Sequence, residues 1–241
     1  MISSKRYVRD TFGATRPLIK GCKWAAFWGL VPFVLLYCIS QLLLTHIHHL
    51  PKMEKAHWLL IYGFAWPYIE VLITAPIIGG WYMMGMKRLS GDTNIAKNEA
   101  YRYLRYAFTF IAISAITYFI AHLLNYLSIW AVYLHHHQVF AALSLAGLLY
   151  GILINFLFWP SMMIAADLHC PFWRAMTLSA RITCRYFWPG VRLFVCWALI
   201  NVVGLLLVGI GLFWTIPWSF LVAATFYSDI KADLLELTHT Q

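Results

Sequence analysis

The sequence predicts an all-α, polytopic membrane protein with six transmembrane helices in three hairpins, joined by cytoplasmic amphipathic connectors. Of its 241 residues, 62% are hydrophobic and only 11% are charged, whereas about 25% are charged in ordinary soluble domains. A soluble core of this length cannot hide so much apolar surface, but a bilayer needs only runs of about 20 apolar residues. Several such runs occur, so the main solvent of this chain is lipid.

The apolar runs place the spans at 24–46, 58–86, 104–131, 139–166, 190–213 and 214–230. They divide the chain into a basic, amphipathic N-terminal segment (1–23), a transmembrane domain (24–230) and a C-terminal tail (231–241). The fifth and sixth spans form a tight hairpin, because Gly209, Gly211 and Pro217 interrupt the apolar run.

The basic residues give the orientation of the spans, since the cytoplasmic side of a membrane protein retains the excess of Lys and Arg. With the N-terminus inside, only Lys52 and Lys55 of the 18 basic residues lie outside. The chain is therefore predicted to lie in a bacterial-type inner membrane with both termini in the cytoplasm. The formal charge of +9 belongs to this asymmetry and does not indicate a nucleic-acid partner.

The cysteines agree with a reduced compartment, because none of the five falls in a predicted outer loop. Residues 1–23 are polar and basic, so no cleaved signal sequence is expected there.

A weak internal repeat runs through 14–92, 100–167 and 180–229. Each unit reads as a basic amphipathic segment, a span going out and a span returning. The returning spans share a proline followed by two small residues, which let neighbouring helices approach closely. These are Pro76 with Gly79-Gly80, Pro160 with Ala165-Ala166, and Pro217 with Ala223-Ala224.

The C-terminal third resembles uncharacterised six-span bacterial inner-membrane proteins. The likeness is carried by Pro160 to Asp167, Arg181, Gly204, Gly209-Ile210-Gly211, and Pro217 with Ala223-Ala224 and Tyr227-Ser228-Asp229. The families concerned are grouped with the membrane domain of glycerophosphodiester phosphodiesterases and its YciC-like relatives. The resemblance implies an α-helical inner-membrane protein without an assigned reaction, and it supplies no catalytic residues.

Polar residues inside the spans are the first candidate site. Glu70 lies about twelve residues from the outer end of its span, roughly 18 Å deep at 1.5 Å per residue. His122 and Asn125 lie at a comparable depth in the third span, and Asn155 and Asn201 add polar groups to the next two. Since such residues need partners in hydrocarbon, we expect a buried polar cluster around Glu70. It serves either as a proton or cation site or as hydrogen-bond glue between helices.

Histidines are concentrated in the two predicted outer loops and form a second candidate site. They could bind Zn²⁺ or Cu²⁺ or gain charge as the outer pH falls, although adjacent histidines point in different directions and match no known metal signature. The alternative is polar loop sequence without a ligand. The six candidate ligands are His46, His48, His49, His135, His136 and His137.

Three cytoplasmic basic segments are expected to contact membrane lipids, because basic amphipathic helices lie on anionic headgroups. A phosphate-bearing ligand is the alternative for the same charges. The residues are Arg16, Lys20, Arg102, Arg105, Arg181 and Arg185.

Signatures of soluble enzymes are absent from the sequence: it has no G-x-S-x-G, no phosphate-binding loop and no dinucleotide fingerprint. We therefore expect a non-enzymatic protein without a resident cofactor, which scaffolds a membrane complex or organises lipids, with a membrane-protein partner or a second copy of itself. The rival interpretation is a small transporter or channel that uses Glu70 and His122.

Overall fold

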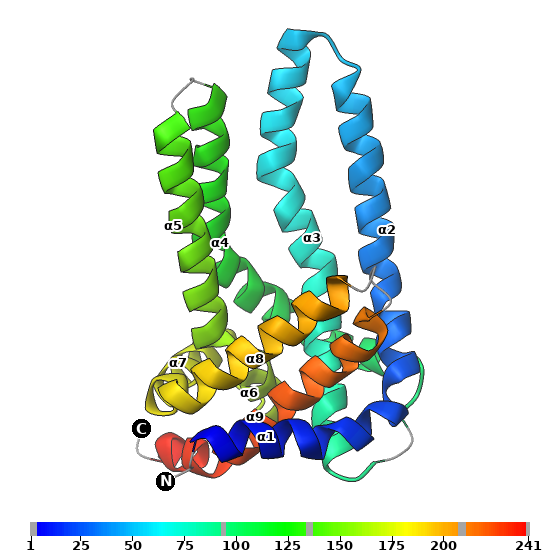
Figure 1. Cartoon of the computed structure of the whole chain (residues 1–241), viewed down its shortest axis with the longest axis vertical. Coiled ribbons are helices and arrows are strands. Elements are labelled where there is room, and N and C mark those ends of the chain that lie inside the picture. Colours follow the sequence, from blue (N-terminus) through cyan, green and yellow to red (C-terminus); the bar gives the residue numbers. More distant parts are fainter. Residues whose placement is uncertain (1–3, 93–94, 134–136, 207–210, 240–241) are drawn as a thin grey trace.

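The chain folds into helices that form two arms standing on a common base (Figure 1). The computed structural model describes residues 4–92, 95–133, 137–206 and 211–239. No strand occurs in these residues, which confirms the all-α prediction. The base contains α1 (Ser4–Thr15), η1 (Arg16–Gly21), η2 (Glu99–Tyr106), α6 (Ser161–Asp167), α7 (Phe172–Arg185), α8 (Phe187–Leu206) and α9 (Leu212–His239).

The first arm pairs α2 (Lys23–His48) with α3 (Lys52–Leu89). Pro32, Pro67 and Pro76 lie inside these helices without ending them, because neighbouring helices and side chains can satisfy the carbonyl groups that a proline frees. With 38 residues, α3 is about 57 Å long at 1.5 Å per residue. This helix therefore runs from the tip of the first arm into the base and connects the arm to the base.

The second arm pairs α4 (Ala107–Tyr133) with α5 (His137–Phe158). The predicted span at 139–166 matches a candidate membrane segment at Gln138–Asp167. Its helix is interrupted at Trp159-Pro160, where α5 ends and α6 begins. The cause is Pro160, which has no N–H for the helix and clashes with the turn before it.

Five helical segments are long and apolar enough to cross a membrane, and they correspond to the first five predicted spans. The predicted sixth span, 214–230, lies in α9 and does not qualify. Figure 1 shows α8 and α9 running obliquely, with the end of their hairpin well below the tips of the arms. The turn residues Gly209 and Ile210 lie outside the described part of the chain.

The core lies in the base, around α9. Phe220 to Ala224, Phe226, Tyr227, Ile230 and Leu234 are all buried on this one helix. The N-terminal segment covers part of it: Phe12 packs edge-on against Trp218 with ring centroids 5.3 Å apart, and the Trp218 indole donates a 2.9 Å hydrogen bond to Thr15 Oγ1. Because other helices pack around the middle of α9, these side chains face protein, and this part of the helix does not need the high hydropathy of a lipid-facing span.

The small residues after the prolines of the repeat are all buried in this core. A Cβ atom at Gly80 would lie 2.1 Å from the Ala100 carbonyl oxygen, and one at Gly85 would lie 2.8 Å from the carbonyl oxygen of Phe220. The backbone of α3 therefore contacts η2 and α9 directly. The predicted close approach of helices at these small residues is confirmed at Gly80.

The arms differ from the base, because most of their apolar side chains are exposed. Leu42 on α2 and Leu149 on α5 are 71% and 59% exposed, and no more than 28% of the residues in any candidate membrane segment are buried within the protein. In a membrane these faces contact lipid. The chain is accordingly a multi-pass helical membrane protein.

Candidate functional site

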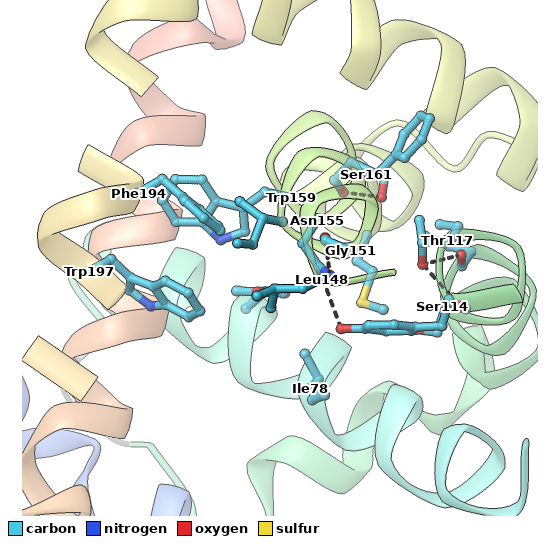
Figure 2. A pocket seen from close by; sticks show the side chains of 16 residues that line it. Ile78, Ser114, Thr117, Leu148, Gly151, Asn155, Trp159, Ser161, Phe194 and Trp197 are labelled. Atoms are coloured by element: carbon cyan, nitrogen blue, oxygen red, sulfur yellow. Dashed lines mark hydrogen bonds between the residues drawn. The ribbon is translucent and has the colours of Figure 1, made fainter. Parts of the chain in front are cut away.

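A cavity of about 440 Å³ lies where the second arm meets the base, between α3, α4, α5, α6 and α8 (Figure 2). Leu148 and Ile152 of α5 are on its rim and are 59% and 51% exposed, so the cavity opens toward the lipid-facing side of that helix. The lining consists of Ile78, Tyr82, Ile113, Ser114, Thr117, Tyr118, Leu148, Gly151, Ile152, Asn155, Phe158, Trp159, Ser161, Met162, Phe194 and Trp197.

One wall of the cavity is aromatic. Figure 2 shows Trp159, Phe194 and Trp197 gathered on the side of α8, opposite Ser114 and Thr117. The rings of Phe194 and Trp197 stack with centroids 5.3 Å apart, and Trp159 meets Phe194 edge-on at 5.9 Å. Behind this wall, Trp159 stacks on Phe226 of α9 at 5.7 Å. The contacts with α9 fix the wall to the buried core and give the cavity a defined shape.

The polar groups of the cavity are mostly satisfied within the protein. The Tyr118 hydroxyl donates a 2.9 Å hydrogen bond to Asn155 Oδ1, and the Asn155 amide donates one of 2.8 Å to the Gly151 carbonyl (Figure 2). Thr117 Oγ1 contacts the carbonyl oxygens of Ile113 and Ser114, both at 2.9 Å. Hydroxyls bonded to their own helix in this way leave an apolar surface toward the cavity.

The described lining contains no carboxylate, imidazole or lysine. Its ionisable groups are the phenols of Tyr82 and Tyr118. The volume of the cavity falls within the range of about 300–1,000 Å³ typical of small-molecule sites. Such sites are mainly apolar, with a few polar groups that orient the ligand. This arrangement suits an apolar chain with at most one or two polar atoms near Tyr118 and Asn155.

Glu70 and His122 lie outside this cavity, higher on the two arms. Glu70 Oε1 accepts a 2.5 Å hydrogen bond from Trp66 Nε1 on its own helix, and it interacts electrostatically with His122 on α4. The His122 ring lies beside Tyr118 and Tyr68, with centroids 5.8 and 6.1 Å away. The structure thus brings Glu70 and His122 together, with Tyr118 linking them to Asn155.

The two remaining asparagines of the predicted cluster have other neighbours. Asn125 is exposed and lies against α5. A Cβ atom added at Gly147 of α5 would lie 3.0 Å from Asn125 Oδ1. Asn201 exchanges hydrogen bonds with Ser219 between α8 and α9, at 2.8 and 3.1 Å. Asn201 therefore joins α8 to α9 and lies apart from the Glu70 region, whereas Asn125 lies against α5.

The predicted metal ligands are only partly described. His46, His48 and His49 are exposed at the end of α2, whereas His135, His136 and the side chain of His137 lie outside the described residues. Within the described part of the chain, no three His, Cys, Asp or Glu side chains are grouped closely enough to hold a metal ion. Metal binding or pH sensing at the outer histidines stays a prediction.

All six basic residues predicted to contact headgroups are exposed, on η1, η2 and α7. On α7 the opposite face is buried through Ala175, Leu178 and Ile182, so this connector is amphipathic as predicted. Arg102 pairs with Glu99 at 3.3 Å and Arg185 with Asp233 at 3.6 Å.

Sequence reasoning identified Asn155 but missed the rest of the cavity. Tyr118 lies one helical turn before His122, so the same depth argument could have included it. Trp159, Phe194 and Trp197 gave no such signal, because aromatic residues near the ends of spans are ordinarily interfacial anchors.

No protein-family model, no curated protein and no solved structure matches the chain.

Proposed function

We propose that this protein is a non-enzymatic inner-membrane protein that organises lipids by holding the apolar part of one lipid-like molecule in the cavity between α4, α5 and α8. The observation that carries the proposal is the cavity itself: about 440 Å³, mainly apolar, and bordered by the exposed Leu148 and Ile152. An acyl or isoprenoid chain can enter from the bilayer without crossing a polar barrier. Tyr118 and Asn155 supply the polar contact for an ester or carbonyl group near its end.

The proposal includes a six-span topology with the base on the cytoplasmic side. Residues 212–228 of α9 carry no charge, and α9 follows directly after α8 in a hairpin. A helix enclosed by α1, α3, α7 and α8 does not need the hydropathy of a lipid-facing span. With the basic connectors η1, η2 and α7 inside, the cavity lies in the cytoplasmic leaflet, which agrees with the positive-inside rule.

A cavity-filling variant tests the proposal. At Gly151 a first added carbon would lie 4.0 Å from the Cβ of Ala121, an ordinary contact, so Gly151→Leu places its remaining atoms in the space of the ligand. Leu149→Phe adds bulk to the same helix on its 59% exposed, lipid-facing side and is the matched control. The native chain and the two variants are purified in mild detergent, and the lipid molecules that each retains are counted by native mass spectrometry.

We expect the native chain and Leu149→Phe to retain one tightly held lipid-like molecule, and Gly151→Leu to lose most of it while keeping its melting temperature. Equal retention by all three proteins would contradict the proposal.

Transport is the second candidate function. It is favoured by the electrostatic interaction of Glu70 with His122 across α3 and α4, at a depth where neither side chain reaches the headgroups. A carboxylate and an imidazole that lie near one another can exchange a proton near neutral pH. Proton-coupled uptake of a solute by reconstituted vesicles would establish this function in place of the first.

A further inference from the structure

A second cavity, of about 390 Å³, lies in the base between the ends of α3, α6 and α9. Its charged lining residues are Lys87 of α3, Asp167 at the end of α6 and Lys231 of α9. Met83 and Met86 form part of its apolar side. Methionine side chains are flexible and adapt to irregular apolar groups. The cavity therefore combines both signs of charge with an apolar floor.

On one side of this cavity, Asp167 and Lys231 leave hydrogen-bonding capacity unused. Lys231 Nζ and the Tyr227 hydroxyl both contact the same oxygen of Asp167, Oδ2, at 2.8 and 2.7 Å. Within the described residues no contact reaches Asp167 Oδ1, and Lys231 has used one of its three N–H groups. One carboxylate oxygen and two ammonium N–H groups thus remain for a ligand.

Lys87, on α3, supplies a further donor to the same cavity. Its Nζ contacts Glu99 Oε1 at 3.0 Å and Asp92 Oδ2 at 3.3 Å, which leaves one of its three N–H groups. The Glu99 side chain is only 3% exposed, so this ion pair holds Lys87 at a fixed place at the end of α3. Lys87 on α3 and Lys231 on α9 are then two hydrogen-bond donors from different helices that line one cavity.

The charged lining residues and their ion-pair partners outside the cavity balance in charge. Lys87, Lys231 and Arg102 give +3, and Asp92, Glu99 and Asp167 give −3, so the net charge of the ion-paired group is zero. A purely anionic ligand would bring its charge close to the free oxygen of Asp167, which repels it. A purely cationic ligand would meet both lysines. A ligand that carries one charge of each sign can pair with both types of group.

We infer that this cavity binds a zwitterionic phospholipid headgroup, whose phosphate accepts hydrogen bonds from Lys87 and Lys231 and whose primary ammonium donates to Asp167. The headgroup chemistry is that of a phosphoethanolamine ester. The lysines lie at the end of the base that carries the basic connectors, at the level where headgroups meet water. The apolar side at Met83 and Met86 receives the glycerol and the first carbons of the chains.

This site is separate from the cavity at Tyr118, and it requires only that the base meets the cytoplasmic leaflet. Failure of the two proposals is therefore distinguishable: filling the first cavity with Gly151→Leu must leave the headgroup preference described here in place.

The test measures binding of three lipids with identical chains to the full-length protein in detergent, by the rise in melting temperature with lipid concentration. Phosphatidylethanolamine carries the ammonium donors, phosphatidylcholine has them methylated, and phosphatidylglycerol lacks the positive charge. We expect the native chain to bind phosphatidylethanolamine about fivefold more tightly than the other two, the size of effect expected from partly exposed ion pairs.

Two variants and their matched controls assign the preference to named groups. Asp167→Asn retains an acceptor for Tyr227 but removes the carboxylate, and it should abolish the preference over phosphatidylcholine. Lys231→Gln should lower the affinity for each of the three lipids about fivefold. Asp10→Asn and Lys97→Gln make the same changes at exposed positions of the chain and should leave binding unchanged.

Equal binding of the three lipids by the native chain would overturn the inference, as would an unchanged preference in Asp167→Asn. Soluble phosphoethanolamine that binds as tightly as the lipid would overturn the assignment to a membrane lipid. If Asp167→Asn fails to fold, Lys231→Gln decides on its own: unchanged affinity in this variant overturns the site.

Discussion

The Tyr118 hydroxyl on α4 donates a 2.9 Å hydrogen bond to Asn155 Oδ1 on α5, at the wall of the 440 Å³ cavity. The same tyrosine lies beside His122 on its upper side, with ring centroids 5.8 Å apart. Tyr118 therefore joins the two polar features of the second arm, the cavity below and the Glu70–His122 pair above. Because the bond links neighbouring helices, it also fixes the width of the cavity.

Removing this hydroxyl should loosen the second arm. We expect Tyr118→Phe to lower the free energy of unfolding by about 0.6 kcal/mol, the average for hydrogen bonds between membrane helices. Tyr37→Phe, on the lipid-facing side of α2 at 64% exposure, is the matched control and should cause no loss. Unfolding in mixed micelles with increasing denaturing detergent measures both variants. Equal stability of the two would show that the bond contributes nothing.

A methyl group at Gly80 should destabilise the fold much more. The new Cβ would lie 2.1 Å from the Ala100 carbonyl oxygen, so α3 and η2 must separate. Overpacking of this kind costs about 1–3 kcal/mol. Gly13→Ala, inside α1, is the control in the same unfolding assay, because no atom of another element lies within 4 Å of the added carbon, and it should cause no loss of stability. Tolerance of Gly80→Ala would contradict the close contact of α3 with η2.

Neutralising Glu70 distinguishes the two candidate functions. Glutamine retains a side-chain oxygen that can accept the hydrogen bond from Trp66, so Glu70→Gln should fold and should retain lipid like the native chain. In vesicles with a pH-sensitive dye inside, we expect the native protein and Glu70→Gln to give the same slow proton leak. Proton-coupled flux that the native chain supports and Glu70→Gln loses would make transport the function.

Thiol reactivity tests the base and its orientation. Cys22 is buried, and this burial raises the pKa of its thiol to about 11, an effect that nearby Arg88 partly opposes, whereas Cys184 on α7 is exposed. Since the thiolate is the reactive form, Cys22 should be alkylated at pH 8 at least about 100-fold more slowly than Cys184. Mass spectrometry of the labelled peptides gives both rates, with unfolded protein as the control.

The same experiment reports topology, because an impermeant reagent reaches only one side of the membrane. Cys184 should react in inverted membrane vesicles and stay unlabelled in intact cells. Labelling from the outside of cells would contradict a cytoplasmic base.

Much of the fold could be predicted from the sequence. Apolar runs are long and lipid-facing, so the first five predicted spans coincide with candidate membrane segments. The obliqueness of α8 and α9 could not be predicted (Figure 1), because tilt is set by packing against neighbouring helices and not by the length of an apolar run. The contact of Phe12 and Thr15 with Trp218 has the same origin, since it joins segments about 200 residues apart.

The sequence predicted Glu70, His122 and Asn155 as candidate site residues, and of these three only Asn155 lines the cavity. Depth in the bilayer identified Glu70 and His122 as residues that need partners, and Asn155 was added as a polar group within an apolar span. The sequence could not show that Asn201 pairs with Ser219 and lies apart from Glu70, because hydropathy does not determine the order of helices around the bundle. The cavity depends on the gap between α5 and α8 and on aromatic side chains, so it emerges only in three dimensions.

The most direct test of the lipid-holding cavity is an experimental structure of the full chain in lipid nanodiscs, at a resolution that shows acyl chains. We predict an elongated density between Leu148 and Ile152 of α5 and the aromatic wall of α8, ending beside Tyr118 and Asn155. A cavity filled by its own side chains, or one occupied only by water continuous with the Glu70–His122 pair, would contradict the proposal.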